Sequence, residues 1–225
     1  HNFALKNISL NKVDNVKMYL GDVKKIIPRI NTNNSLIGLK SSWKNKQLQS
    51  RVKKGTNLIE IFIKDGDLQN NFNEIVDQIK QLRKKNIQVI LHYPEKYNNL
   101  PVDLSSNKTD VKKATLDCIK KTYSLQKESG ALGYVLHPLS LGNARKTRYN
   151  LDNVISHINK IKKQYPNIFS HAFFENLSHK DPLGTINTFN MFRKATGFNN
   201  YCIDLAHIFI SSKKDMDVVE DYIDF

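Results

Sequence analysis

Short apolar runs alternate with longer segments of helical period along most of the chain. The runs are rich in β-branched and aromatic residues, and they cover residues 36–39, 58–63, 87–92, 132–137, 168–175 and 201–204. Their apolar residues are consecutive rather than alternating with polar ones, which is typical of strands that are covered on both faces. The pattern therefore predicts six buried strands.

The segments between these runs carry apolar residues at the spacing of amphipathic helices. We predict helices over residues 73–85, 109–129, 151–165 and 185–196. Alternating strands and helices favour a parallel α/β sheet built from βα units. Residues 1–35 precede the first run and are charged, so we expect an N-terminal extension outside the sheet. The main domain is expected to cover residues 36–225.

The chain is long enough to bury a core, and it is strongly basic. It has 225 residues, of which 40% are hydrophobic. It carries 35 Lys and Arg residues against 21 Asp and Glu residues, which gives a formal net charge of +14. This excess favours contact with a polyanion or an anionic surface through a long-range field. The alternative is that Lys and Asn are simply abundant throughout the sequence.

We expect neither a targeting segment nor a cysteine framework in this sequence. No stretch approaches the ~20 consecutive apolar residues of a membrane span, and residues 1–6 do not resemble a secretory signal. We expect a soluble protein with no membrane partner. Cys118 and Cys202 are too few for a disulfide framework. An intracellular location is expected, in the cytoplasm or wherever the genome lies, in nucleoid or nucleus.

Polar side chains stand at the C-terminal ends of four successive predicted strands. They are His92, His137, Glu175 and Asp204, and His207 follows three residues after the last of them. In a parallel α/β barrel these strand ends open on one face, so the side chains are expected to converge. A single His at a strand end is more often structural. Two imidazoles and a carboxylate together, however, suit Zn²⁺ or a similar divalent ion.

Four short motifs surround these residues. They are Leu91-His92-Tyr93-Pro94, Leu136-His137-Pro138-Leu139-Ser140, Phe174-Glu175-Asn176-Leu177-Ser178 and Cys202-Ile203-Asp204-Leu205-Ala206-His207. In order and spacing they resemble the strand-end motifs of the endonuclease IV family of apurinic/apyrimidinic endonucleases, which belongs to the xylose-isomerase-like TIM barrels. The resemblance runs from about Leu36 to about Ser212 and implies a (β/α) TIM-barrel type of fold.

The resemblance also implies a function and a set of metal ligands. The implied enzyme is a DNA repair hydrolase that cuts the backbone 5′ to an abasic site, through a hydroxide activated by zinc. Up to three Zn²⁺ ions are implied, with Mn²⁺ as the alternative metal, but only the first site has all its expected ligands in this chain. By resemblance, His92 and His137 bind the first ion, and Glu175 bridges the first and second and is the predicted catalytic residue. Asp204 binds the second ion and His207 the third.

Basic residues near the predicted barrel mouth are candidates for DNA contacts. They are Lys40 and Lys44 around the exit of the first strand, and Arg145, Lys146 and Arg148 after the fourth. Side chains of this kind contact phosphates in protein–DNA complexes. The alternative for each is a solvated surface charge.

The chain departs from the family pattern at single positions and in its number of strands. Lys40 stands where such proteins commonly have His, and Leu205 where they have a small hydroxyl residue. A complete barrel has eight βα units, whereas about six are predicted here, so two sheet edges need cover. We expect that the chain continues past Phe225 or that a partner chain completes the barrel. Closure by the N-terminal arm is the third option.

Two other functions stay open at this point. The first is a sugar-phosphate isomerase or epimerase of the same superfamily, with one divalent metal, Glu175 as ligand or base, and a role for Glu60. The second is a non-catalytic, degenerate barrel that binds nucleic acid or protein. The basic charge and the Cys-Ile-Asp-Leu-Ala-His run favour the endonuclease.

Overall fold

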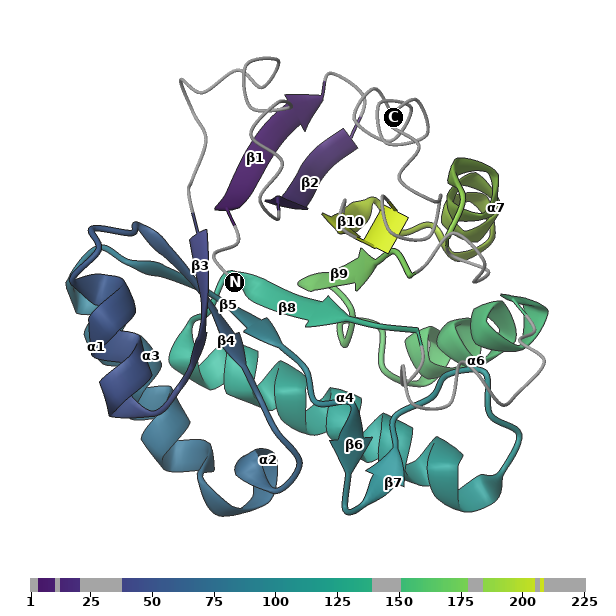
Figure 1. Ribbon diagram of the computed structural model, residues 1–225. Coiled ribbons are helices and arrows are strands. Elements are labelled where there is room, and N and C mark those ends of the chain that lie inside the picture. The colour runs from purple at the N-terminus through teal and green to yellow at the C-terminus, as the bar shows by residue number, and fades with distance from the viewer. Residues whose placement is uncertain are drawn as a thin grey trace.

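Six parallel strands form a curved sheet, and helices cover its outer face (Figure 1). The computed structural model describes residues 4–10, 13–20, 38–138, 151–177, 184–204 and 207–208. The parallel strands, in spatial order, are β3 (Gly38–Ser42), β4 (Leu58–Phe62), β5 (Gln88–His92), β8 (Gly133–Leu136), β9 (Ala172–Glu175) and β10 (Asn200–Asp204). This parallel half-barrel confirms the predicted α/β class and the count of six βα-type strands.

The four predicted helices are present, each within one residue of its expected ends. The helices are α1 (Asn45–Val52), α2 (Asp67–Asn70), α3 (Phe72–Lys84), α4 (Thr109–Ser129), α6 (Leu151–Gln164) and α7 (Ile186–Thr196). Short elements were not predicted, namely α1, α2 and the small antiparallel pair β6 (Lys96–Tyr97) and β7 (Leu100–Pro101). They are too short to show a clear period in the sequence.

The predicted strand over residues 168–175 is wrong in its first half. Strand β9 begins only at Ala172. Ile168 and Phe169 are buried against the core, which is why the run is apolar, but they lie in a turn. The backbone N–H groups of Ile168 and Ala172 donate to carbonyls three residues earlier, each at 3.1 Å. Burial in a turn and burial in a strand leave the same apolar signature.

The inner face of the sheet is built in two layers. The main core joins strands to helices, whereas a second cluster contains only strand residues and therefore lies on the face away from the helices. This cluster takes one buried side chain from each of five strands, namely Leu58, Ile90, Val135, Phe173 and Cys202. Successive side chains of a strand alternate between its faces. The residue two positions further along each strand therefore faces the same way. In all five cases this residue is polar, namely Glu60, His92, His137, Glu175 and Asp204.

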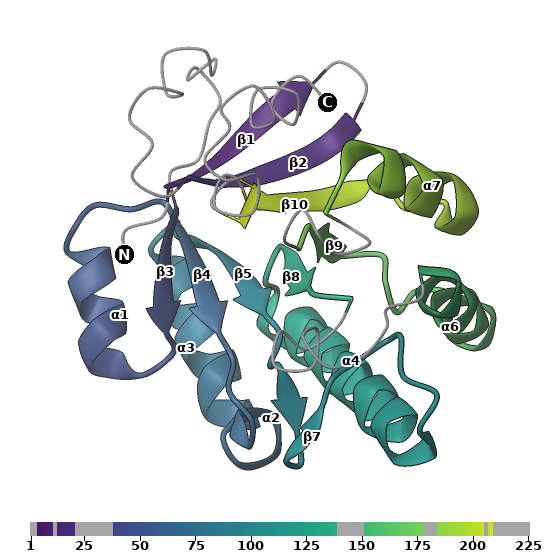
Figure 2. The same cartoon turned by 45° about the vertical axis from the view of Figure 1, so that its right-hand side comes forward.

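The N-terminal segment contributes to the sheet, contrary to the expected extension outside it and in agreement with the option that the N-terminal arm covers an edge. Strands β1 (Ala4–Leu10) and β2 (Val13–Leu20) form an antiparallel hairpin. Strand β2 pairs in parallel with β10, with Asn15 opposite Asn200 and Tyr19 opposite Asp204. Figure 2 shows the two strands side by side. The sheet is thereby extended to eight strands, and β1 contacts β3 at the other end of the order. The predicted domain boundary at residue 35 stays a prediction.

The hairpin has a simple physical reason. Without β2, strand β10 would present a row of unpaired backbone N–H and C=O groups at the sheet edge. Pairing with β2 satisfies those groups along Asn200–Asp204, the strand that carries Asp204 to the barrel mouth. Apolar periodicity does not report such pairing, because the partner segment is charged and lies almost the whole chain away.

Among the helices that the structure describes, none combines the length and the apolar character that a bilayer span requires.

We predict that a proline in β2 weakens the fold. Lys17 lies opposite Cys202, in a strand with partners on both sides, so Lys17→Pro removes a ladder N–H. The free energy of unfolding in urea should fall by about 3 kcal/mol, and light scattering should rise as the edge of β10 becomes available. Lys17→Thr keeps the N–H group and should match the wild-type protein. Equal unfolding midpoints for the proline and threonine variants would contradict the pairing.

Candidate metal centre

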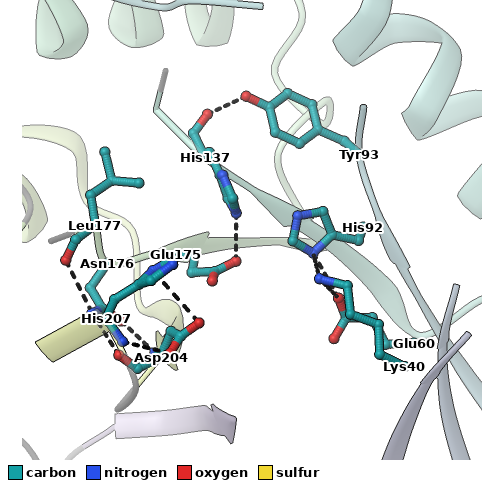
Figure 3. Close-up of polar contacts among 10 residues, drawn as sticks. All are labelled: Lys40, Glu60, His92, Tyr93, His137, Glu175, Asn176, Leu177, Asp204 and His207. Atoms are coloured by element: carbon teal, nitrogen blue, oxygen red, sulfur yellow. Dashed lines mark hydrogen bonds and ion pairs between the residues drawn. The ribbon is translucent and has the colours of Figure 1, made fainter. Parts of the chain in front are cut away.

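Five polar side chains from four strand ends meet at the C-terminal mouth of the half-barrel (Figure 3). His92 ends β5, His137 follows β8, Glu175 ends β9 and Asp204 ends β10. Their potential ligand atoms form two groups, each within 4.8 Å, which are His92, His137 and Glu175, and Glu175, Asp204 and His207. All the residues that the sequence predicted as metal ligands are thus together, and Glu175 belongs to both groups.

The first group is buried and closely packed. His92, His137 and Glu175 are each no more than 4% exposed. His137 Nε2 lies 2.7 Å from Glu175 Oε2, and the rings of His92 and His137 meet edge to face with centroids 4.7 Å apart. The hydroxyl of Tyr93 donates to the backbone carbonyl of His137. Burial and these contacts give the side chains of the first group little room to move.

The second group is held in place by an amide that joins two strand ends. The side-chain oxygen of Asn176 accepts the backbone N–H of Asp204 at 2.5 Å, and its nitrogen donates to the Asp204 carbonyl at 3.1 Å. The backbone N–H of His207 donates to Asp204 Oδ1 at 3.0 Å, and His207 Nδ1 lies 3.6 Å from Oδ2. Asn176 therefore aligns the ends of β9 and β10, which carry Glu175 and Asp204.

Two further residues belong to the same polar layer, and sequence reasoning gave them other roles. Glu60 is buried on β4, and its Oε1 lies 2.6 Å from His92 Nδ1. Lys40 on β3 lies 3.1 Å from the same oxygen and 3.2 Å from His92 Nδ1. The signal that could have placed them is the alternation of each strand, since Glu60 lies two residues after Leu58 and Lys40 two residues after Gly38.

The structure describes only two of the five residues that were predicted to contact DNA. Lys44 is exposed just after β3, with its ammonium 6.0 Å from the centre of the Trp43 ring. Lys40 points into the mouth toward Glu60 and His92 (Figure 3). Arg145, Lys146 and Arg148 lie outside the described residues. Their role in DNA binding stays a prediction.

Burial and charge together set the acid–base properties of the mouth. Burial by itself raises the pKa of Glu175, but the charge and hydrogen bond of His137 and the charge of His92 lower it to about 2. Burial raises the pKa of Glu60 well above its usual value, and the nearby Glu175 and Asp204 charges raise it further. Burial lowers the pKa of His92, and Lys40 lowers it further. Glu175 is therefore ionised and His92 neutral near pH 7, the forms in which these side chains bind metals.

The side chains fit a divalent metal. Imidazole nitrogens and carboxylate oxygens are the ligands that Zn²⁺ takes in proteins. Within the described part of the chain, His137 Nδ1, His207 Nδ1 and Glu60 Oε2 are buried without a hydrogen-bond partner. Unpaired buried polar atoms cost free energy, and three of them in one mouth indicate a missing polar or charged occupant. His92, His137 and Glu175 form the more completely buried of the two ligand groups.

Comparisons with known proteins bear on the fold. No protein-family model matches the chain, and no curated protein matches it. Solved structures do match, among them a D-psicose 3-epimerase in the presence of D-fructose, with 17% identity, a TM-score of 0.62 and coverage of 81% of this chain and 68% of that chain. Endonuclease IV from Thermus thermophilus matches with 13% identity, a TM-score of 0.56 and coverage of 83% and 71%.

An L-ribulose 3-epimerase matches with 17% identity, a TM-score of 0.55 and coverage of 77% of this chain. The chain spans 61% of that epimerase's length. At such identities the likeness shows a shared TIM-barrel type of fold, and the matches include both a nuclease and sugar epimerases.

We predict that Glu175 makes the metal-free protein sensitive to acid. Because its folded-state pKa is about 2 against an ordinary 4.5, ionised Glu175 stabilises the fold above about pH 4.5, and this contribution is lost as the pH falls toward 2. In EDTA, Glu175→Gln should flatten the fall of the unfolding free energy over this range by up to about 1.4 kcal/mol per pH unit. Glu74→Gln, at an exposed site on α3, should keep the wild-type slope. A steep slope retained by Glu175→Gln would contradict the assignment.

Proposed function

We propose that this chain carries the metal site of a phosphodiesterase that cleaves DNA at abasic sites. The observation that supports the proposal most is the convergence of the motif residues. The five side chains that resemble endonuclease IV ligands come from four separate strand ends, and their ligand atoms fall into two groups within 4.8 Å that share Glu175. A degenerate barrel would have no need to keep both groups in place.

The side chains at the mouth would serve as ligands for metal ions. His92, His137 and Glu175 would hold a first metal ion, and Glu175 with Asp204 and His207 would hold further ions. Zn²⁺, or Mn²⁺ in its place, would supply Lewis acidity for a phosphoryl oxygen and a lowered pKa for water. The shared carboxylate of Glu175 would keep the two ligand groups at a fixed separation, and the burial of the first group excludes bulk solvent from its ligands.

The proposed partner is duplex DNA that contains an abasic site. The formal net charge of +14 would attract a phosphate backbone over a distance, and this attraction would weaken with salt. Lys44 lies exposed just after β3, on the face where the strand ends open, next to the partly buried ring of Trp43. Such a cation is suited to positioning a backbone phosphate without reading the base sequence.

A sugar epimerase is the second candidate, and one local feature favours it. Glu60 and Glu175 are both buried at the same mouth, so two carboxyl groups with pKa values shifted in opposite directions face one site. Such pairs serve as acid and base in proton transfer next to a carbonyl. The structural match to a D-psicose 3-epimerase agrees with this alternative in fold.

We predict that the protein nicks a duplex carrying one abasic site and that a buried histidine is essential. His137→Gln should lower the rate at least ~100-fold, because it removes a ligand from the first group. His157→Gln is the matched control, since His157 Nδ1 contacts the Leu104 carbonyl on the helical side of the fold, at 2.7 Å. Gel assays of nicking and metal content per chain provide the measurement.

The same preparation separates the two candidates. Nicking of the abasic duplex, lost in His137→Gln and kept in His157→Gln, supports the nuclease. Conversion of D-fructose to its 3-epimer, with no nicking at any salt concentration, would replace it with the epimerase. Neither activity in protein loaded with Zn²⁺ or Mn²⁺ would argue against both.

A further inference from the structure

Lys40, Glu60 and His92 form a polar cluster on β3, β4 and β5, beside the first ligand group. Lys40 and Glu60 are direct partners in the parallel ladder between β3 and β4, and His92 ends the next strand. Glu60 Oε1 is the common contact of the cluster, 3.1 Å from Lys40 Nζ and 2.6 Å from His92 Nδ1. Figure 3 shows the other ring nitrogen of His92 on the side of His137.

The proton positions in this cluster follow from its donors. The ammonium of Lys40 has hydrogen-bond donors and no acceptor, so the oxygen that it contacts, Oε1, accepts. Lys40 Nζ also lies 3.2 Å from His92 Nδ1, so both charged side chains meet this ring nitrogen. When the other ring nitrogen binds a metal, the single proton of the neutral ring lies on Nδ1, where Oε1 is its acceptor. The remaining ring nitrogen, Nε2, is left with its lone pair toward the first ligand group.

We propose that Glu60 is a positioning residue that sets the tautomer and ring orientation of His92 for metal binding, and that Lys40 makes this possible. The inference rests on the proposed metal site and adds this cluster to it. Histidines that bind metals generally donate their other ring N–H to a carboxylate or carbonyl, which orients the ring and raises its basicity. Glu60 holds that position for His92, and Lys40 Nζ lies 3.1 Å from the same carboxylate oxygen, where its positive charge is close enough to favour the ionised carboxylate.

A purely structural role explains this cluster less well. Buried ion pairs often stabilise a fold no more than apolar side chains of the same volume, because both charges lose their hydration. Glu60 is 2% exposed, and Oε2 has no hydrogen-bond partner within the described part of the chain. A sheet interior that served packing alone would be better filled at this position by the kind of residue found one layer below, such as Leu58. The cost of burying the Glu60 carboxylate is accounted for by its contact with His92.

The assignment also changes the role predicted for Lys40. Sequence reasoning placed Lys40 among the contacts to DNA phosphates. In the structure its ammonium is directed at Glu60 and His92 inside the mouth, and it is only partly exposed. Lys40 therefore acts on the metal ligands through Glu60, whereas Lys44 keeps its exposed position on the rim.

The test uses Co²⁺ as a spectroscopic probe in place of the native metal. Affinity is measured by competition with a chelator, and the visible absorption of bound Co²⁺ reports the geometry of its ligands. Glu60→Gln should weaken Co²⁺ binding 10- to 100-fold and alter the absorption bands. Asp67→Asn is the matched control, because Asp67 is also a buried carboxylate but accepts from Lys64 N and Asn71 Nδ2 near α2. It should bind Co²⁺ like the wild-type chain.

A second variant covers the case in which Glu60→Gln fails to fold. The double substitution Lys40→Met with Glu60→Leu removes both charges and leaves neither one buried alone, so it should fold while His92 loses its acceptor. It should show the same loss of Co²⁺ affinity. Wild-type Co²⁺ affinity and spectrum in the folded variants would overturn the positioning role alone. A wild-type chain that binds no Co²⁺ would overturn the proposed metal site, and this inference with it.

Discussion

The two-residue side-chain period of the inner strand faces is the constraint on which the rest of the structure depends. Each of five neighbouring strands has one inward-facing apolar residue, and these five side chains pack together in the half-barrel. The next inward position on the same strands is Glu60, His92, His137, Glu175 or Asp204. A strand can carry its side chains to alternate faces only, so a shift of one residue in any strand would turn its polar group toward the helices. The ligand cluster and the core therefore require the same register.

Burial of so much charge is possible because each charged group has a partner. Glu175 faces His137 at 2.7 Å, and Glu60 lies between Lys40 and His92. Asn176 joins the ends of β9 and β10, and the N-terminal hairpin pairs with the outer edge of β10. These contacts fix the position of β10 relative to β9 on one side and to β2 on the other. Among the described residues, the buried side-chain nitrogen and oxygen atoms that stay unpaired all lie at this mouth, where a metal ion would find its ligands.

A shared barrel type does not decide between chemistry on DNA and chemistry on sugars, since matched structures include endonuclease IV and sugar epimerases. Function on such folds is decided by the side chains at the strand ends and in the loops. In this chain the two ligand groups, the shared Glu175 and the basic charge support the nuclease, whereas the second buried carboxylate, Glu60, supports the epimerase. Because Glu60 contacts His92, one of the predicted metal ligands, the burial of Glu60 is consistent with the nuclease as well.

Much of this arrangement could be predicted from the sequence, and the limits have physical reasons. Continuous apolar runs and helical periods identified the parallel strands and the four long helices, because burial on two faces leaves a local pattern. The strand-end residues, from His92 to His207, could be named because parallel strands open on one face. The turn at Ile168 and Phe169 could not be separated from a strand, since both leave buried apolar residues. Only the tertiary structure decided that β2 pairs with β10 and that Lys40 and Glu60 meet His92, because these contacts join segments far apart in the chain and depend on strand register.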